Sequence, residues 1–255
     1  MVLILTDQRT MAYINLYAVL GTIPYLCELD DKAKDLIKDE NVSIGFSVKG
    51  GPHGTLLFQD GKCSFVRGCD SCNVKLPFSS PEKFNGMIDG TVTPIPSKGF
   101  TKIGFLLKKF MPLTDILSSY LRADEKALED PVFFEKSTKL MFHLIASAVA
   151  QIGNVDKVGR ASASYIVDGA VKLGIGNEMA LTIVAKNNKL AAVHKAPKKF
   201  TSYMIFEDIT LARALFDGKV NAVAAVGEGK IRIGGMISQV DNINRILDRV
   251  ALYLA

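Results

Sequence analysis

The stretch Ile205–Gly234 reads IFEDITLARALFDGKVNAVAAVGEGKIRIG, and an earlier stretch, Phe78–Gly104, reads FSSPEKFNGMIDGTVTPIPSKGFTKIG. Each begins with the end of an apolar strand and a helix-start signal, continues through an amphipathic helix closed by Asp-Gly, and ends in Ile-Gly. The pairs that define the offset are Lys62 with Lys189 at 127, Gly90 with Gly218 at 128, and Gly104 with Gly234 at 130. A near-constant offset is typical of an internal duplication, so the sequence predicts two copies of one unit.

Length and composition agree with two soluble domains. The chain has 255 residues, 48% of them apolar, and a net charge of +5 without a block of like charge, so we expect no nucleic-acid partner. The N-terminus lacks the basic region of a secretory signal, and the longest apolar run, Leu140–Ile152, is shorter than the ~20 residues of a membrane span. We therefore expect a cytoplasmic protein with domains at residues 1–123 and 124–255 and a linker at Ala123–Asp130.

Hydrophobic periodicity and turn signals predict the elements of the first unit. Residues 8–39 have helical spacing, interrupted at Gly21–Pro24. Asp60-Gly61 lies between two apolar runs and predicts a hairpin, and Ser80-Pro81 is a helix start. The predicted strands are 42–48, 54–59, 62–67, 73–78 and 100–103, and the predicted helices after them are 81–89 and 104–121.

The second unit repeats this order. A helix is predicted from Asp130 to Gln151, a short helix at Ile209–Phe216, and a final helix at Met236–Leu254. The predicted strands are 165–173, 179–186, 190–195, 201–206 and 231–233. The fold class that follows is α+β, a tandem duplication in which each unit is a mainly antiparallel five-stranded sheet covered by helices on one face.

Three features resemble the sterol carrier protein type 2 lipid-binding domain. They are the hairpin at Asp60-Gly61-Lys62, the short helices that end in Asp89-Gly90 and Asp217-Gly218, and the loop into Gly229–Gly234 that leads to an apolar helix. The resemblance covers roughly residues 40–122 and 165–254, and the second copy matches it better, since the first carries Pro94 and Pro96 in its loop. It implies an apolar tunnel between sheet and helices that holds a lipid or fatty-acyl chain, and it implies no catalytic residues.

The residues expected to line this tunnel lie on the inward faces of the short and final helices of each unit. They are Phe84, Met87, Ile88, Phe105, Phe110 and Ile116 in the first unit, and Leu211, Leu215, Phe216, Met236, Val240, Ile243 and Leu247 in the second. The same helical spacing is explained fully by side chains that pack on the sheet and leave no cavity. The resemblance and the apolar excess favour the tunnel.

Cys69 and Cys72 form a C-x-x-C pair in the turn between the third and fourth strands. Such a pair can be half of a zinc site or a redox motif. His53 is the nearest further ligand by sequence, which makes three ligands at best, and Cys63 lies at the other end of its strand. We expect surface thiols, with metal binding second and catalysis third.

Nucleophilic catalysis and cofactor binding find little support in the sequence. His53, His143 and His194 have no evident Ser or Cys partner with an acid to orient it, and His143 reads as a core histidine. No glycine-rich loop has phosphate-binding form, so we expect no cofactor. Lys195, Lys198 and Lys199 could meet lipid headgroups in a transient contact with a membrane surface, although a charged, soluble turn explains them equally.

Two hypotheses follow. In the first, the protein is a non-catalytic lipid-binding or lipid-transfer protein that holds an acyl chain or a sterol-like ligand. In the second, it is an interaction or structural protein whose pockets have closed. An enzyme that uses Cys69 and Cys72 is a distant third.

Overall fold

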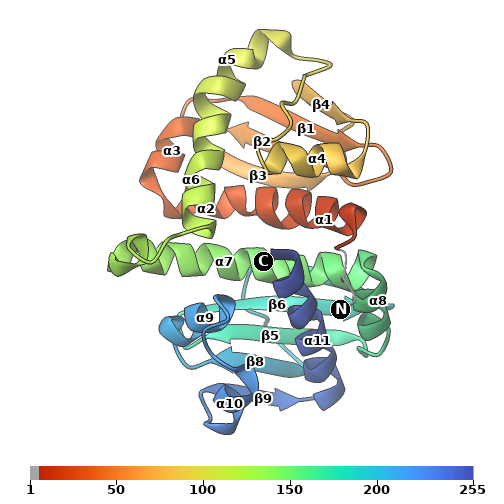
Figure 1. Ribbon diagram of the computed structural model, residues 1–255, viewed down its shortest axis with the longest axis vertical. Helices are drawn as coiled ribbons and strands as arrows, with labels where there is room; N and C mark the ends of the chain where they lie inside the picture. The colour runs from red at the N-terminus through yellow and green to blue at the C-terminus, as the bar shows by residue number, and fades with distance from the viewer. Residues whose placement is uncertain (1–5, 255) are drawn as a thin grey trace. The chain divides into compact units, whose positions relative to one another are not determined.

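A computed structural model describes residues 6–254 (Figure 1). The chain divides into two compact units, Met1–Leu140 and Met141–Ala255, and each combines helices with one mixed β-sheet. The division falls inside helix α7 (Pro131–Val155) rather than at the linker expected at Ala123–Asp130. The segment predicted not to be a secretory signal includes Met1–Leu5, and these five residues lie outside the described residues.

In unit 1, helices precede and follow a sheet of four strands. Its regular elements are α1 (Gln8–Ile14), α2 (Ile23–Leu29), α3 (Asp31–Ile37), β1 (Val42–Val48), β2 (His53–Gln59), β3 (Lys62–Arg67), β4 (Val74–Phe78), α4 (Pro81–Ile88), α5 (Ile103–Phe105) and α6 (Met111–Leu121). The strand order is β3-β2-β1-β4, with β1 parallel to β4 and the other pairs antiparallel. The sheet is therefore mixed.

Unit 2 has the same plan with a fifth strand. After the C-terminal part of α7, its elements are α8 (Lys157–Ser164), β5 (Gly169–Ile175), β6 (Met179–Lys186), β7 (Lys189–Val193), β8 (Ser202–Phe206), α9 (Ile209–Phe216), α10 (Ala222–Gly227), β9 (Ile231–Gly235) and α11 (Ile237–Leu254). The strand order is β7-β6-β5-β8-β9, with β5 parallel to β8. The expected five-stranded sheet is confirmed here, and the short α10 lies in a segment expected to be a loop.

The two sheets share the same register. Ile44 pairs with Val74 in unit 1, and Val171 pairs with Ser202 in unit 2, at offsets of 127 and 128 along the chain. Both hairpin turns have two residues with positive φ, Asp60-Gly61 and Asn187-Asn188, which is the geometry of a tight turn between antiparallel strands. The hairpin turns and the strand pairing of unit 1 therefore recur at the corresponding positions of unit 2.

The fifth strand predicted at Phe100–Ile103 is wrong. Phe100–Lys102 is a 3-10 turn that leads into α5, and Lys98 makes only an isolated bridge with Lys75. Because Lys75 corresponds to Tyr203, whose partner on β9 is Gly234, the residue equivalent to Gly234 is Lys98 and not Gly104. Two prolines before this bridge remove backbone donors and prevent the ladder from extending.

The predicted helix break at Gly21–Pro24 is also wrong. A π-helical turn (Asn15–Val19) and a 3-10 turn (Leu20–Thr22) carry the helical path from α1 into α2, and Pro24 fits because it lies in the first turn of α2. By length and hydropathy alone, Gln8–Leu29 is one segment that could cross a membrane. Its residues Leu16, Leu20 and Ile23 are buried in the hydrophobic core of unit 1, which accounts for that apolarity.

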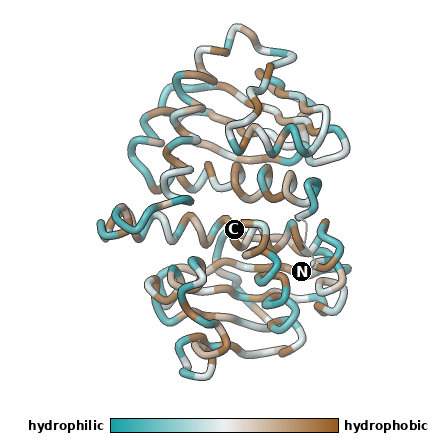
Figure 2. Tube along the Cα trace, in the orientation of Figure 1, coloured by the Kyte–Doolittle hydropathy of each residue, from teal (hydrophilic) through white to brown (hydrophobic). Residues whose placement is uncertain are grey.

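The helices that contact each sheet do so on one face, which we call the inner face. In unit 1 the inner face carries Ile44, Phe46 and Val48 of β1, and in unit 2 it carries Val171, Leu173 and Ile175 of β5, all of them buried. The hydropathy-coloured trace shows apolar residues along the strands and along α1 and α7 (Figure 2). Alternation along each strand thus places the core on the helical side.

Each unit also buries an aspartate at the start of a helix. Asp30 accepts from the Ala33 backbone N–H and from the Tyr120 hydroxyl at 2.7 Å. In unit 2, Asp156 accepts from the Gly159 backbone N–H, from the Tyr253 hydroxyl at 2.9 Å and from the Arg249 guanidinium at 2.9 Å. Asp30 thus ties α3 to α6, and Asp156 ties α8 to α11.

Candidate lipid-binding surfaces

The tunnel residues predicted in unit 1 lie in a packed core. Phe84, Phe105 and Phe110 are buried, and Met87, Ile88 and Ile116 are partly buried against the same cluster. The ring centroids of Phe84 and Phe78 are 5.1 Å apart, and those of Phe105 and Phe58 are 5.4 Å apart. These edge-to-face contacts fill the inner face with side chains.

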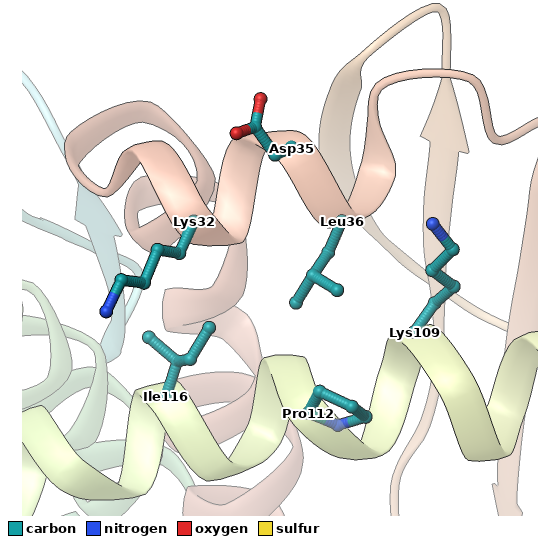
Figure 3. A pocket seen from close by; sticks show the side chains of 6 residues that line it. All are labelled: Lys32, Asp35, Leu36, Lys109, Pro112 and Ile116. Carbon is teal, nitrogen blue, oxygen red and sulfur yellow. The ribbon is translucent and has the colours of Figure 1, made fainter.

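An open groove of about 400 Å³ lies elsewhere in unit 1, between α3 and α6. Leu36, Pro112 and Ile116 form its apolar part, with Lys32 and Lys109 toward its two ends (Figure 3). The sixth lining residue is Asp35, whose carboxylate points away from the groove in this view. Of the residues predicted to bind lipid, only Ile116 lines this groove.

The inner face of unit 2 is arranged in rows along β8 and β9. The register pairs Phe206 with Ile231, Met204 with Ile233, and Ser202 with Gly235. α9 covers the first row, since Phe216 contacts Phe206 with ring centroids 5.9 Å apart. α11 covers the third row. Ser202 and Phe206 are four residues apart on β8, so at ~3.4 Å per residue the outer rows are roughly 14 Å apart. The Met204–Ile233 row therefore lies between the two helices.

Side chains of α11 fix it over the third row. The Met236 backbone N–H donates to Ser202 Oγ at 2.9 Å, and Ser202 Oγ donates to Gln239 Oε1 at 2.5 Å. Gln239 is fully buried and also donates through Nε2 to the Val167 carbonyl oxygen at 2.9 Å. The sequence analysis missed Gln239 because a glutamine one position from an apolar stripe reads as a surface residue.

The predicted residues of unit 2 are less completely packed than those of unit 1. Leu211, Leu215, Phe216 and Leu247 are half-buried, Met236 is exposed, and Val240 and Ile243 are buried. Ile233, on the middle row, is 44% exposed although its side chain lies on the inner face. This edge of the sheet therefore offers apolar surface directly beside the core.

α10 adds further exposed apolar side chains next to β9. Val223 and Val226 are exposed, while Ala225 is buried, and the Lys230 backbone N–H donates to the Ala225 carbonyl oxygen at 2.9 Å. Ile237, the first residue of α11, is exposed as well. With Ile233 and Met236 these residues form what we call the β9 patch: Val223, Val226, Ile233, Met236 and Ile237.

The surface position expected for Cys69 and Cys72 is wrong, since both are buried. β3 and β4 are not neighbours, so their connection is a crossover and not a hairpin turn. It crosses the outer face of the sheet, where a Cβ placed on Gly45 would lie 2.6 Å from Cys72 Sγ. The glycine thus makes room for the two thiols.

His53 does lie at this end of the unit, with Nδ1 3.9 Å from Cys69 Sγ. Among residues 6–254, no group of three or more His, Cys, Asp or Glu side chains is placed to hold a metal ion. That Cys69 and Cys72 bind no zinc stays a prediction, and a zinc assay of the purified protein tests it. At the other end of β3, a hydrogen bond to Cys27 and burial raise the pKa of the Cys63 thiol.

One histidine of unit 2 has a serine partner that the sequence analysis did not identify. Ser147 Oγ is 2.9 Å from His194 Nε2, and His194 Nδ1 is 2.7 Å from His143 Nδ1. Burial lowers the pKa of His194 to about 4, and burial with the His194 charge lowers the pKa of His143 to about 3. Both rings are therefore neutral at pH 7. Ser147 lies four residues after His143 on α7, so both side chains reach His194 from the same side of the helix.

Comparisons with known proteins give partial similarities. No family model and no curated protein matches the chain. A ubiquinone synthesis protein described as UbiJ-SCP2 is 16% identical over 44% of this chain and 96% of its own, with a TM-score of 0.35. The sterol carrier protein domain 2 of Helicoverpa armigera is 17% identical over 45% of this chain and 88% of its own, with a TM-score of 0.34. A sterol carrier protein 2 structure is 12% identical over 44% and 95%, with a TM-score of 0.31. At these TM-scores, the similarities do not assign the chain to a family.

Proposed function

We propose that the protein is a non-catalytic, cytoplasmic lipid-binding protein and that unit 2 holds the apolar chain of its ligand. The chain would lie on the inner face, over the Met204–Ile233 row between α9 and α11. The observation that carries the proposal is the exposure of Ile233 and of the β9 patch at the edge of an otherwise buried face. Exposed apolar patches mark interaction sites or ligand-binding grooves, and this one adjoins the core.

A comparison of the short helices supports this choice of unit. α4 places Phe84 against the sheet, and the matching position in α9 is Ala212, which is fully buried. Replacing a phenylalanine by an alanine removes most of a side chain from this layer. Phe142 and Phe216 stack beside Phe206 and fill part of that space. We propose that the remainder admits the ligand.

We further propose that the two units are tandem copies of one domain similar to the sterol carrier protein type 2 domain. Shared strand register, matching hairpin turns and the equivalent aspartate–tyrosine contacts support this relationship. Unit 1, with its packed inner face, would then have lost or closed its tunnel. The interaction-protein hypothesis applies to unit 1 on the same grounds.

Titration of the full-length protein with a fluorescent fatty acid tests the ligand. Buried hydrocarbon contributes ~0.8 kcal/mol per CH₂ before ordering costs, so affinity should rise with acyl length and change little with salt. Mass spectrometry of a solvent extract should show a co-purified lipid. Wild-type protein that binds no chain length at micromolar concentration would leave only the interaction-protein hypothesis.

A matched pair of substitutions tests the location. Ile233→Glu places a charge on the middle row and should weaken binding by about tenfold or more, because a buried charge is costly. Val66→Glu is the control, since Val66 is 43% exposed, like Ile233, and lies on β3, an edge strand of unit 1. Equal loss in both variants would contradict the location in unit 2.

A further inference from the structure

The last helical segment of unit 1 presents two different faces. It runs from the 3-10 turn at Phe100–Lys102 through α5, a π-helical turn at Leu106–Phe110, and α6. Phe105, Phe110 and Leu113 of this segment are buried in the core. The π-helical turn explains the five-residue step from Phe105 to Phe110, because one extra residue is accommodated while both rings face inward.

The opposite face carries four large apolar side chains that are exposed. Phe100 is 60% exposed, Ile103 37%, Leu107 58% and Met111 52%. Their spacing of three, four and four residues places them along one side of the helical path, and we call them the apolar stripe. A run of this kind on a surface marks an interaction site, since scattered single residues are the ordinary case.

The charged residues within this stretch of chain all have one sign. From Gly90 to Thr114 the chain contains no Asp, Glu or Arg, and it contains four lysines. Lys98 donates to the Cys72 carbonyl oxygen at 2.8 Å and is held against the sheet. The other three, Lys102, Lys108 and Lys109, lie within the helical segment, and Lys109 also lines the groove of Figure 3.

We propose that the apolar stripe docks unit 1 on an anionic lipid bilayer. Phe100, Ile103, Leu107 and Met111 would enter the boundary between headgroups and acyl chains, while the lysines meet the phosphates. Apolar side chains on one face of a helix with lysines beside them are the composition of helices that lie in a membrane interface. Each lysine near an anionic surface adds attraction that salt screens.

The lysines favour a bilayer over an acidic protein partner. Recognition of fixed carboxylates on a protein surface selects arginine, whose planar fork makes two directed hydrogen bonds. Lysine is a flexible point charge, which suits a diffuse layer of headgroups. The absence of arginine between Gly90 and Thr114 therefore points to lipid.

This docking surface is independent of the ligand proposed for unit 2. The stripe lies on the helical segment from Phe100 to α6, whereas the β9 patch lies on α10, on β9 and at the start of α11. Fatty-acid titration in solution does not involve the stripe, and vesicle binding does not require Ile233. The two proposals can therefore fail separately.

Sedimentation of the full-length protein with vesicles tests the docking. Wild type should bind vesicles of phosphatidylcholine with phosphatidylserine, and binding should fall as salt is raised. The double variant Phe100→Ser/Leu107→Ser should bind about tenfold or more weakly, because it removes both well-exposed anchors. Val132→Ser/Val158→Ser is the control, since those valines are exposed by 62% and 53%.

A charge-reversal pair tests the role of the lysines. Lys102→Glu/Lys108→Glu should reduce binding by about tenfold or more, while Lys186→Glu/Lys189→Glu, in an exposed hairpin turn of unit 2, should leave it unchanged. Wild type that stays in the supernatant with anionic vesicles would overturn the proposal. Equal binding to phosphatidylcholine alone, or equal losses in the variants and their controls, would also overturn it.

Discussion

Unit 1 and unit 2 place the same strand register beneath different helical covers. In unit 1, Phe84 of α4 reaches the sheet and contacts Phe78 and Phe46. In unit 2, α9 has Ala212 at the matching position, and aromatic rings from α7 and α9 take up part of the space. One position on an eight-residue helix thus carries a large aromatic side chain in unit 1 and a methyl group in unit 2.

The segments after the short helices differ in the same way. Unit 2 continues into α10 and β9, which leaves Ile233 exposed on the inner face. Unit 1 has no strand there, and its chain enters a helical segment with the apolar stripe on the outside. Exposed apolar side chains therefore lie beside the sheet edge in unit 2 and on the outer side of a helical segment in unit 1, which matches the separate ligand-binding and docking roles that we propose.

The largest expected effect is the loss of Phe84. Phe84→Ala should destabilise unit 1 by about 3–5 kcal/mol, since the ring is fully buried and leaves a cavity. Ala212→Gly at the matching position removes one methyl group and should cost about 1 kcal/mol, mainly through helix propensity. Hydrogen exchange measured on peptides from each unit separates the two effects. Equal losses would contradict the difference between the inner faces.

The buried aspartates give the next prediction. Asp156→Ala should destabilise unit 2 by about 3 kcal/mol, because it leaves the Arg249 guanidinium and the Tyr253 hydroxyl without their shared acceptor. Asp30→Ala should cost less, about 1–2 kcal/mol, since Lys136 is 3.7 Å away and keeps access to water. Urea unfolding followed by circular dichroism measures both. A larger loss for Asp30→Ala would reverse this ranking.

The histidine pair should make unit 2 the pH-sensitive unit. Because burial lowers both histidine pKa values, the unfolded chain binds more protons than the folded one below pH ~6.5. Stability is therefore complete above that pH and falls toward pH 4. For His194 the loss is about 2 kcal/mol between pH 6.5 and pH 5. The matching residue of unit 1 is Arg67, whose guanidinium lies over the Tyr17 ring at 4.2 Å.

The variant His194→Gln isolates this effect. It should remove about 2 kcal/mol of the pH dependence of unit 2 over that range, as measured by urea unfolding at pH 6.5 and pH 5. Arg67→Gln is the control and should leave the pH dependence of unit 1 unchanged. A pH profile that His194→Gln does not alter would show that His194 becomes protonated in the folded protein.

Local signals in the sequence predicted many of the turns and helices that the two units share. The turn at Asp60-Gly61 and the short helices beginning after Ser80 and Asp208 are confirmed, because each depends on a cap or a positive φ encoded by adjacent residues. The residues expected to line the tunnel were predicted from helical periodicity, which identifies the inward face of a helix. That periodicity contains no information on whether the opposing sheet face is filled.

Long-range contacts account for the errors. The equivalence of Lys98 with Gly234 depends on which residue of β4 it bridges, and the strand that the sequence predicted at Phe100 is replaced by helix after two prolines. The Ser147–His194 contact joins a helix to a strand end 47 residues later in the chain. The positions of Cys69 and Cys72 depend on a crossover that the sequence alone could not distinguish from a turn.

The last prediction concerns that crossover. Gly45→Ala would place a Cβ 2.6 Å from Cys72 Sγ and 3.1 Å from Cys69 Cβ, so the connection must shift, at a cost of about 1–3 kcal/mol. Gly174→Ala on β5 of unit 2 is the control. Its nearest neighbour, Ile205 Cγ1, would be 3.4 Å away, and no backbone strain arises, so the change in the free energy of unfolding should lie within about 0.5 kcal/mol.

Urea unfolding of the single variants, of Cys72→Ala and of Gly45→Ala/Cys72→Ala completes a double-mutant cycle. Removing Cys72 Sγ should recover part of the Gly45→Ala loss, because it deletes the atom that the new methyl group meets. Additive losses would mean that the crossover in solution does not press on Gly45, and the two outer faces would then differ less than the coordinates of Cys69 and Cys72 indicate.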